Sequence, residues 1–395
     1  MAMNYDDVVL TTPVSFGYSK FSDKTSTWFA GSVLRNLLAQ SGLEKKRVDG
    51  LSLSSFSLAP DTVPSVVQSL GLSLRWLANI PYGGASGVIA AKRAARTIQS
   101  GDAEVVACIG ADTLGPDDFQ NLVANFSNAT RDASYPYAGG GPNLAFALMT
   151  QAYMEKYAVK REDFAQISVE QRYNANHYAP ALLGQKSLSL EDYMDARVVV
   201  EPLHLFDCVM PCAGADGFLV MRRTLADELD LPRVSIGAAF ECFNVFPEDP
   251  VQLRAGWSLY GDDLFAAAGL TRDDIDVIET YDDYPVVVMM QLEGMGFCPP
   301  GEAVRFLQTH SMKFVAGGLP HNTNGGQLSV GQAGASGGFL GIVEALRQLL
   351  QVADSNQVPA ANHALVTGFG MVNYDRGLCS SAMILSCNEH QPDAG

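Results

Sequence analysis

Apolar and polar positions along this chain fall into two kinds of segment. Short runs rich in branched apolar residues, such as 105–110 and 363–368, have the length and composition of buried strands. Longer segments, such as 85–100 and 335–351, have the apolar spacing of helices that pack on one face. Because each of these helices leads into a strand, the pattern predicts an α/β protein.

The chain carries an internal duplication. The tetrapeptide Gly-Ala-Ser-Gly occurs at 84–87 and again at 334–337, and each copy opens one of the two predicted helices. Upstream of each copy, a Gly-Leu dipeptide, at 42 and at 269, ends a helix just before a buried strand. Two matched elements in the same order predict two homologous α/β halves packed in layers.

The first half is predicted to comprise residues 1–115 with 215–245, and the second half residues 246–395. Residues 116–214 have a different texture, with proline-containing turns, a triple glycine and helical runs. They are expected to form an inserted loop domain. Insertions on a rigid α/β scaffold commonly shape a substrate site.

Composition and charge narrow the possible partners. The chain has 395 residues, 47% of them hydrophobic, and 26 basic against 43 acidic residues give a formal net charge of −17. Its longest basic run is Lys45-Lys46-Arg47, so nucleic acid is not an expected partner. The acidic N-terminus has no apolar leader and no uncharged apolar run reaches about 18 residues. We therefore expect a cytoplasmic protein without membrane insertion.

The cysteines point to reduced core thiols. There are seven, mostly inside apolar segments. Cys208 and Cys212 have no second Cys/His pair at ligand spacing, so no metal site is expected. Neither Gly-Ala-Ser-Gly segment extends to a phosphate loop or a dinucleotide fingerprint, so no bound nucleotide cofactor is expected.

This order of elements resembles the thiolase superfamily, and within it the sterol-carrier or lipid-transfer type. The resemblance implies a thiolase fold: two βαβαβαββ halves in an α/β/α/β/α arrangement with an inserted loop domain. The matching motifs are Tyr-Gly-Gly-Ala-Ser-Gly at 82–87, Ile-Gly-Ala-Asp at 109–112, Tyr-Asp-Asp-Tyr at 281–284, Leu-Glu-Gly-Met-Gly-Phe-Cys at 292–298 and Asn-Thr-Asn-Gly-Gly-Gln-Leu-Ser at 322–329.

The sequence departs from the thiolase pattern at four catalytic positions. The nucleophilic cysteine of Cys-x-Ser-Gly is replaced by Gly84, and the histidine of Gly-His-Pro by Gln332. The connection 368–377, which resembles the segment that holds a second cysteine, contains none, and His-Asp-Cys-Phe reads Tyr-Asp-Asp-Tyr from Tyr281. Acyl transfer through a covalent intermediate needs a nucleophile and a base, and both are missing.

Retro-aldol cleavage of a β-hydroxyacyl thioester needs no thiolate. It requires a base for the hydroxyl proton, donors for the enolate oxygen and an acid for the α-carbon. The chain resembles the sterol side-chain acyl-CoA aldolases, which have lost the same cysteines. This resemblance implies a carbon–carbon lyase that releases an aldehyde or ketone and a shorter acyl-CoA. Coenzyme A then enters as part of the substrate, and no other cofactor is implied.

The same resemblance points to catalytic residues. Those aldolases have a tyrosine at the position of Tyr281, which implies a catalytic role unless it is only a buried aromatic at a strand end. Tyrosine titrates near 10 and Asp283 would raise that pKa, which favours a donor or acid. The aldolases have a second tyrosine where this chain has Gln332, whose amide can donate but not titrate. Tyr374 is a third candidate, for proton transfer, unless it is an ordinary exposed loop aromatic.

The glycine-rich loops are expected to bind the substrate. The residues concerned are Gly84, Ser86, Asn324, Gly325 and Gly370. Glycine allows close approach of the backbone, and backbone N–H groups can hold a thioester or enolate oxygen. Ser86 occupies the family's structural serine position, so capping or packing is its other explanation.

Two other functions stay open from the sequence: a thiolase-like acyltransferase or condensing enzyme with a non-standard nucleophile, and a non-catalytic thiolase-fold scaffold. The resemblance also implies a homodimer formed through the first half. Relatives without their own lipid-transfer domain often work with a small protein made of a zinc ribbon and an OB-type barrel, which makes a hetero-oligomer possible here.

Overall fold

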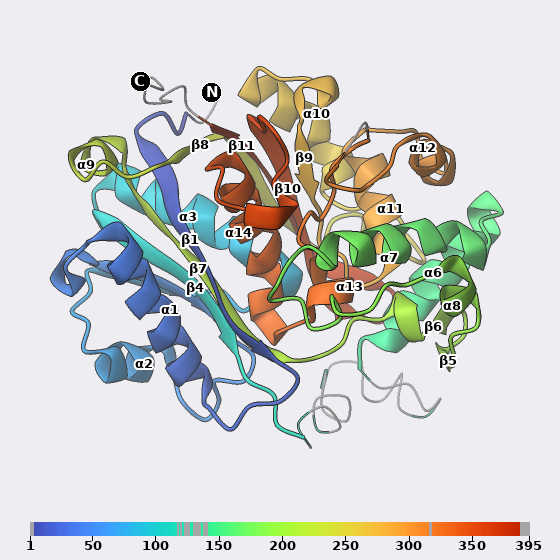
Figure 1. The fold of residues 1–395 in the computed structure, drawn as a ribbon, viewed down its shortest axis with the longest axis horizontal. Helices are drawn as coiled ribbons and strands as arrows, with labels where there is room; N and C mark the ends of the chain where they lie inside the picture. The colour runs from blue at the N-terminus through green and yellow to red at the C-terminus, as the bar shows by residue number, and fades with distance from the viewer. Residues whose placement is uncertain are drawn as a thin grey trace.

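A computed structural model describes residues 4–116, 118, 121, 127, 128, 136, 141–315 and 318–387 (Figure 1). Strands and helices alternate through both halves. The first half contains β1 (Val8–Ser19), α1 (Ser26–Ser41), β2 (Gly50–Ser54), α2 (Val63–Leu70), β3 (Trp76–Asn79), α3 (Ser86–Ser100), β4 (Val105–Asp112), β7 (Ala213–Arg222) and α9 (Arg223–Glu228). The second contains β8 (Val234–Phe243), α10 (Trp257–Ala268), β9 (Val277–Glu279), α11 (Pro285–Gly294), α12 (Ala303–Thr309), α13 (Gly326–Val330), α14 (Gly337–Leu349), β10 (His363–Asn373) and β11 (Arg376–Cys387).

Between β4 and β7 lies the predicted insertion, much of whose first part, between 117 and 140, falls outside the described residues. Its described elements are α6 (Asn143–Tyr157), α7 (Arg161–Ala175), α8 (Leu190–Met194), β5 (Val198–Val200) and β6 (Leu203–His204). Strands β5 and β6 pair only with each other, in a separate small sheet. The helices α6 and α7 pack against α11, α12 and α13, as Figure 1 shows.

The main sheet has the strand order β3-β2-β4-β7-β1-β8-β11-β10-β9 among the described residues. Its two parts meet where β1 pairs with β8 through only two residue pairs, Val9–Ser235 and Leu10–Val234. In contrast, β8 pairs with β11 along nearly its whole length. Strand β8, which the predicted division includes in the first half, thus pairs with strands of both parts of the sheet.

The two Gly-Ala-Ser-Gly segments meet at the centre of the molecule. A short 3₁₀ turn (Gly83–Ala85) opens α3 and another (Gly334–Ser336) opens α14, and the two helices pack against each other. A Cβ at Gly87 would lie 2.2 Å from the carbonyl oxygen of Gly338, and one at Gly338 would lie 2.3 Å from that of Gly83. Only glycine permits so close an approach of the two helix entrances.

Three apolar cores separate the layers. One joins α3 and α14 to the facing sides of both sheet parts, one lies between α1, α2 and the first part, and one lies between α10, α11, the insertion and the second part. The layers are therefore helix, sheet, helix, sheet, helix. This is the predicted layered arrangement. Among the described residues the second half has four strands where the predicted βαβαβαββ order has five, and the stretch between α11 and α14 contributes only an isolated bridge to β9, between His321 and Ile278.

Asp112, at the end of β4, ties the two halves together. Its Oδ1 accepts hydrogen bonds from the N–H groups of Phe56 and Ser57, at 2.8 and 2.7 Å, and from the hydroxyl groups of Ser55 and Ser57. Its Oδ2 accepts the N–H of Ala335 at 2.7 Å, at the entrance of α14. One buried carboxyl group thus joins a loop of the first half to the glycine-rich turn of the second.

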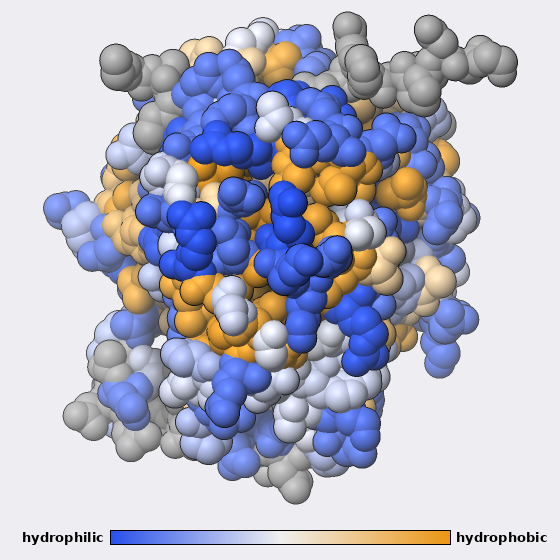
Figure 2. Space-filling view, turned by 90° about the vertical axis from the view of Figure 1, so that its left-hand side faces the viewer, coloured by the Kyte–Doolittle hydropathy of each residue, from blue (hydrophilic) through white to orange (hydrophobic). Residues whose placement is uncertain are grey.

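The side of the molecule formed by the first half carries apolar surface. Figure 2 views this side and shows apolar side chains gathered near its centre, with hydrophilic ones among and around them. Strand β3 is an outer strand of the main sheet, and its Leu77 is 37% exposed. Among the described helices, none is long and apolar enough to cross a membrane.

Candidate active site

The segment 280–284 connects the end of β9 to helix α11. Pro285 occupies the first turn of the helix, where its missing N–H is not needed, and it holds the preceding Tyr284 extended, with φ −146° and ψ 147°. Tyr281 and Asp283 lie on one side of this segment, where both contact Gln332, and Asp282 lies on the other side, at α13.

The ring of Tyr281 lies directly over Gly84. A Cβ built at Gly84 would stand 2.1 Å from Cε2 of Tyr281 and 2.3 Å from the carbonyl oxygen of Phe369. No side chain fits there without displacing the ring. Tyr281 thus fills the volume that a side chain at position 84 would occupy, so this position of the ring requires glycine at 84.

Gln332 connects Tyr281 to Asp283. Its Nε2 donates to the hydroxyl oxygen of Tyr281 at 2.9 Å and also to Oδ1 of Asp283. The backbone of Gln332 is fixed on both sides, because its N–H donates to the carbonyl of Met210 at 2.8 Å and its carbonyl accepts the N–H of Cys212 at 2.9 Å. The insertion's last segment therefore holds Gln332 in place.

Burial dominates the ionisation of this group. Tyr281 is 6% exposed, and burial followed by the charge of Asp283 raises its pKa well above 10. Burial raises the pKa of Asp283 to about 8, against a smaller lowering by a hydrogen bond from Tyr281. Tyr281 is therefore protonated at neutral pH and acts as a donor. Asp283 can gain or lose a proton near neutral pH.

Asp282 has a structural role on the opposite face. Its Oδ1 accepts the N–H of Gln327 at 2.9 Å and its Oδ2 accepts the N–H of Leu328 at 3.2 Å, in the first turn of α13. Burial raises its pKa to about 6, and the two backbone donors oppose that rise. Asp282 anchors the glycine-rich loop that leads into α13.

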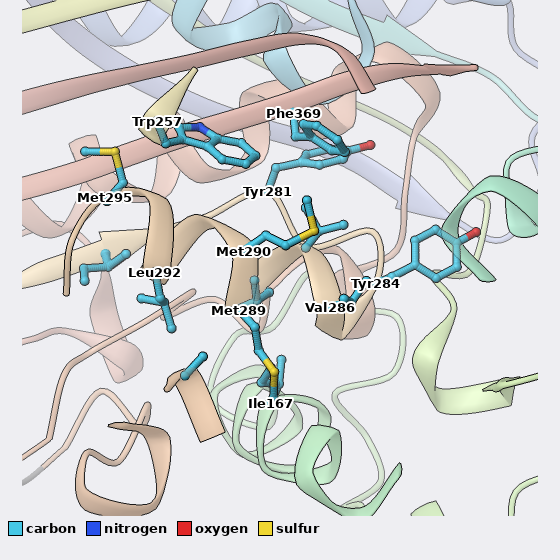
Figure 3. Close-up of a cluster of buried hydrophobic side chains, with 14 of the residues drawn as sticks. Ile167, Trp257, Tyr281, Tyr284, Val286, Met289, Met290, Leu292, Met295 and Phe369 are labelled. Atoms are coloured by element: carbon cyan, nitrogen blue, oxygen red, sulfur yellow. The ribbon is translucent and has the colours of Figure 1, made fainter. Parts of the chain in front are cut away.

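An aromatic wall lies behind Tyr281. Figure 3 shows Tyr281 next to Phe369 above α11, with Trp257 to one side. The rings of Trp257 and Phe369 are 5.3 Å apart, and Tyr284 stacks on Phe146 of the insertion at 4.0 Å. This wall covers one side of Tyr281, while its hydroxyl group meets the Gln332 amide.

Two of the residues predicted to bind the substrate form hydrogen bonds to the backbone of their own loops. The Ser86 hydroxyl donates to the carbonyl of Ile80 and accepts the N–H of Tyr82, both at 2.9 Å, so it is used within its own loop. Asn324 accepts the N–H of Gly326 at 2.8 Å. These bonds hold the glycine-rich loops in shape beside Tyr281.

Two of the predicted glycines allow close contact with other segments. Gly325 has φ +100°, and a Cβ there would lie 2.4 Å from Cβ of Ala175 in α7. A Cβ at Gly370 would lie 2.2 Å from the carbonyl oxygen of Tyr82, so the second half packs on the loop that contains Gly84. The expected substrate contacts of these residues remain predictions.

Tyr374 has a different setting from the other two catalytic candidates. It lies in the turn between β10 and β11, with φ +56°, and its side chain is 44% exposed. The structure therefore brings Tyr281 and Gln332 into one buried group but leaves Tyr374 at the surface.

No cysteine is prepared to act as a nucleophile. Burial raises the pKa of all seven thiols. Burial, together with the charges of Asp207 and Asp283, raises the pKa of Cys208 to about 12. Among the described residues, no group of three or more His, Cys, Asp or Glu side chains is arranged to hold a metal ion.

Comparison with known proteins places this geometry in a family. Residues 248–385 match the family described as Thiolase C-terminal domain-like. A 17-hydroxy-3-oxo-4-pregnene-20-carboxyl-CoA lyase of Mycobacterium tuberculosis is 30% identical over 367 residues, 89% of this chain and 93% of that protein. The chain belongs to the thiolase superfamily.

Two further proteins to which the chain is similar are named as aldolases. A steroid side-chain-cleaving aldolase of Thermomonospora curvata is 29% identical over 387 residues, 94% of this chain and 95% of that protein. The solved structure of an Ltp2-ChsH2(DUF35) aldolase has a TM-score of 0.83 and 28% identity, and covers 97% of this chain and 98% of that one.

The sequence analysis of this thiolase-superfamily site did not predict a catalytic role for Asp283. It considered Asp283 only as a negative charge that would raise the pKa of Tyr281. The signal was present, because Asp283 shares a face with Tyr281 and neither a high-pKa phenol nor an amide can take up a proton near neutral pH. Its burial and its contact with Gln332, 49 positions away, appear only in the fold.

Proposed function

We propose that this protein is a carbon–carbon lyase that cleaves a β-hydroxyacyl-CoA by a retro-aldol reaction. The products are an aldehyde or ketone and a shorter acyl-CoA, without a covalent acyl-enzyme. The observation that carries the proposal is the Tyr281 ring, which fills the nucleophile's place over Gly84 while its hydroxyl is held by Gln332. The names of the relatives, an aldolase and an acyl-CoA lyase, support the same reaction.

The proposed roles follow from what each group can donate. Tyr281, with its raised pKa, is the acid that delivers a proton to the α-carbon of the enolate. Gln332 has a fixed backbone and directs its two amide hydrogens at Tyr281 and Asp283, so it holds these two groups in place. Backbone N–H groups near Gly84 and Gly370 lie in the same region and are proposed to hold the thioester oxygen.

Replacement of Tyr281 by phenylalanine tests the proposal. The ring still fills the space over Gly84 but the proton is gone, so we expect turnover of β-hydroxyacyl-CoA substrates to fall about 100-fold or more. Released carbonyl product and shortened acyl-CoA are measured by mass spectrometry. Tyr153→Phe is the control, because it removes a buried hydroxyl bonded to Glu293 outside the site. Full activity of Tyr281→Phe would refute the assignment.

Tyr374 remains a proposed proton-transfer residue, with a smaller contribution to turnover than Tyr281. Its side chain is 44% exposed, so we expect Tyr374→Phe to lower turnover less than Tyr281→Phe does. Measuring both variants in one assay ranks them. A larger loss in Tyr374→Phe would move the main proton-transfer role to the β10–β11 turn.

The two other functions make different predictions. An acyltransferase would leave an acyl adduct on the protein after incubation with acyl-CoAs, and intact mass spectrometry would detect it. The raised thiol pKa values argue against a cysteine adduct. A non-catalytic scaffold predicts no turnover by the complex under any conditions.

We propose a hetero-oligomer with a second protein of the zinc-ribbon and OB-barrel kind. The similar solved structure, an Ltp2-ChsH2(DUF35) aldolase, is named for two components, which supports this assembly. A homodimer through the first half is also proposed, supported by the apolar side seen in Figure 2 and the outer strand β3. The seven free cysteines fit a cytoplasmic location. Co-purification followed by light scattering measures both associations.

A further inference from the structure

Asp283 is a buried carboxyl group that has no cation beside it. It is 8% exposed, and among the described residues no lysine, arginine or histidine forms a salt bridge or hydrogen bond with it. A buried carboxyl group without a positive partner costs stability, because its ionised form loses hydration that nothing replaces. Buried groups of this kind are concentrated at functional sites.

The contacts of Asp283 place it within the group described above. One amide nitrogen, Nε2 of Gln332, donates to both Oδ1 of Asp283 and the hydroxyl oxygen of Tyr281. An amide nitrogen has two hydrogens, so it can serve both acceptors at once. A purely structural aspartate would bond backbone donors, as Asp282 does at α13. Asp283 instead meets the two side chains that carry the proposed chemistry.

We propose that Asp283 is the base of the reaction, an inference that rests on the proposed function. Its carboxylate takes the proton of the substrate's β-hydroxyl group. The electron pair of that O–H bond forms the C=O bond of the released aldehyde or ketone, and the Cα–Cβ bond breaks. The pair from that bond enters the enolate of the thioester. Tyr281 then gives its proton to the α-carbon, and Asp283 returns the proton it took to the Tyr281 phenolate.

This sequence conserves protons and needs no co-reactant. The hydroxyl proton taken at the start is the one that restores Tyr281 at the end. The hydrogen bond between Tyr281 and Asp283, which lowers the pKa of the carboxyl group, provides the return path. Gln332 keeps the two groups together throughout and changes no charge of its own.

The charges around Asp283 set the pH at which it can act. The titratable groups that interact with its charge are Tyr281, Asp282 and Tyr284 from its own segment and Cys208 from the segment before β7. Burial and, to a smaller extent, the charge of Asp282 raise the pKa of Asp283 to about 8. About one molecule in ten is then ionised at pH 7, so activity should rise about tenfold between pH 7 and alkaline pH.

The test is the pH dependence of kcat/KM between pH 6 and 10, measured on the full chain with its partner protein where one is required. In the parent, kcat/KM should rise with pH along a limb whose midpoint lies near pH 8. Asp283→Asn keeps the size of the side chain and an acceptor for Gln332. Its kcat/KM should be about 100-fold lower or more, and it should no longer rise with pH along this limb. Asp283→Glu, which restores a carboxylate, should recover part of the rate and a limb.

Asp282→Asn is the matched control. It is the neighbouring buried aspartate with a structural role, so the limb should persist and move to lower pH, because one negative charge near Asp283 is gone. Dissociation constants for the product acyl-CoA, measured for each variant, separate lost chemistry from lost binding.

The outcomes separate the two claims. A parent that cleaves β-hydroxyacyl-CoAs while Asp283→Asn keeps the same limb and a rate within a few fold overturns the role of Asp283 alone. A parent that cleaves none overturns the proposed function and this role together. If Asp283→Asn does not fold, the parent's profile decides, because a parent without a limb near pH 8 refutes the base.

Discussion

Replacing Gly84 by alanine adds one methyl group against the ring of Tyr281. The new carbon would lie 2.1 Å from Cε2 of that ring and 2.3 Å from the backbone oxygen of Phe369, where ordinary contact begins at 3.4 Å. The ring must move by about 1 Å or more, and the carbonyl group belongs to strand β10 and cannot move freely. Overpacking of a filled core costs about 1–3 kcal/mol, and we expect the upper part of that range.

The same shift should remove most of the activity. Displacing a catalytic group by about 1 Å can cost about 100-fold in rate, so Gly84→Ala should resemble Tyr281→Phe in turnover. Urea unfolding and the lyase assay measure the two effects. The double variant with Tyr281→Ala should show a coupling of about 0.5–3 kcal/mol, because the ring contact is then absent and only the clash with the Phe369 carbonyl remains.

A control glycine separates backbone strain from crowding. Gly101 has φ +83° and open space around its Cβ position, so Gly101→Ala should cost about 1–2 kcal/mol in stability and nothing in activity. If Gly84→Ala keeps the parent's midpoint of unfolding and its turnover, the ring does not lie over Gly84 and the requirement for glycine at 84 is wrong.

Three further predictions concern stability and reactivity. Asp283→Asn should be more stable than the parent by up to about 4 kcal/mol at pH 7, because a carboxyl pKa of about 8 in the fold against about 4 in the unfolded chain makes ionisation oppose folding. The difference should grow from about pH 4 to about pH 8 in melting experiments, and a variant that is no more stable than the parent at pH 8 contradicts the high pKa. Asp112→Ala should cost at least about 3 kcal/mol in urea unfolding, since its loss leaves buried donors of both halves unpaired, and a cost below about 1 kcal/mol would show that Asp112 does not hold the halves together. Iodoacetamide at pH 7.5 should modify the native protein far more slowly than free cysteine and leave turnover intact, because every thiol pKa is raised; rapid modification with loss of activity would reopen the search for a nucleophile.

The fold could be predicted because its signals are local and repeated. The two Gly-Ala-Ser-Gly segments mark the entrances of α3 and α14, which begin within two residues of the predicted positions. Close packing of backbones demands glycine there, so a motif of four residues carried information about a contact between helices 250 positions apart. The pairing of β8 with β11 could not be predicted, because no local pattern records the partner of a strand.

The site was predictable only where the resemblance supplied positions. Tyr281 and Gln332 lie 51 positions apart, and their hydrogen bond could not have been found from spacing. Ser86 shows the opposite difficulty, since its hydroxyl is used by Ile80 and Tyr82 and not left free for a ligand. Whether a loop aromatic such as Tyr374 faces solvent depends on the path of the β10–β11 turn, which sequence pattern does not fix.

The pairing of β1 with β7 has a consequence for how the chain is made. These strands pair from Val8–Arg222 to Ser19–Ala213, so the first strand of the protein waits for its partner until the whole insertion has been synthesised. At the usual rate of about 5–20 residues per second, that delay is roughly 10–40 seconds. During it, both edges of β1 and one edge of β4 have no native partner strand. The newly made chain is therefore most exposed to aggregation in this interval, and a ribosome that pauses within the insertion would lengthen it.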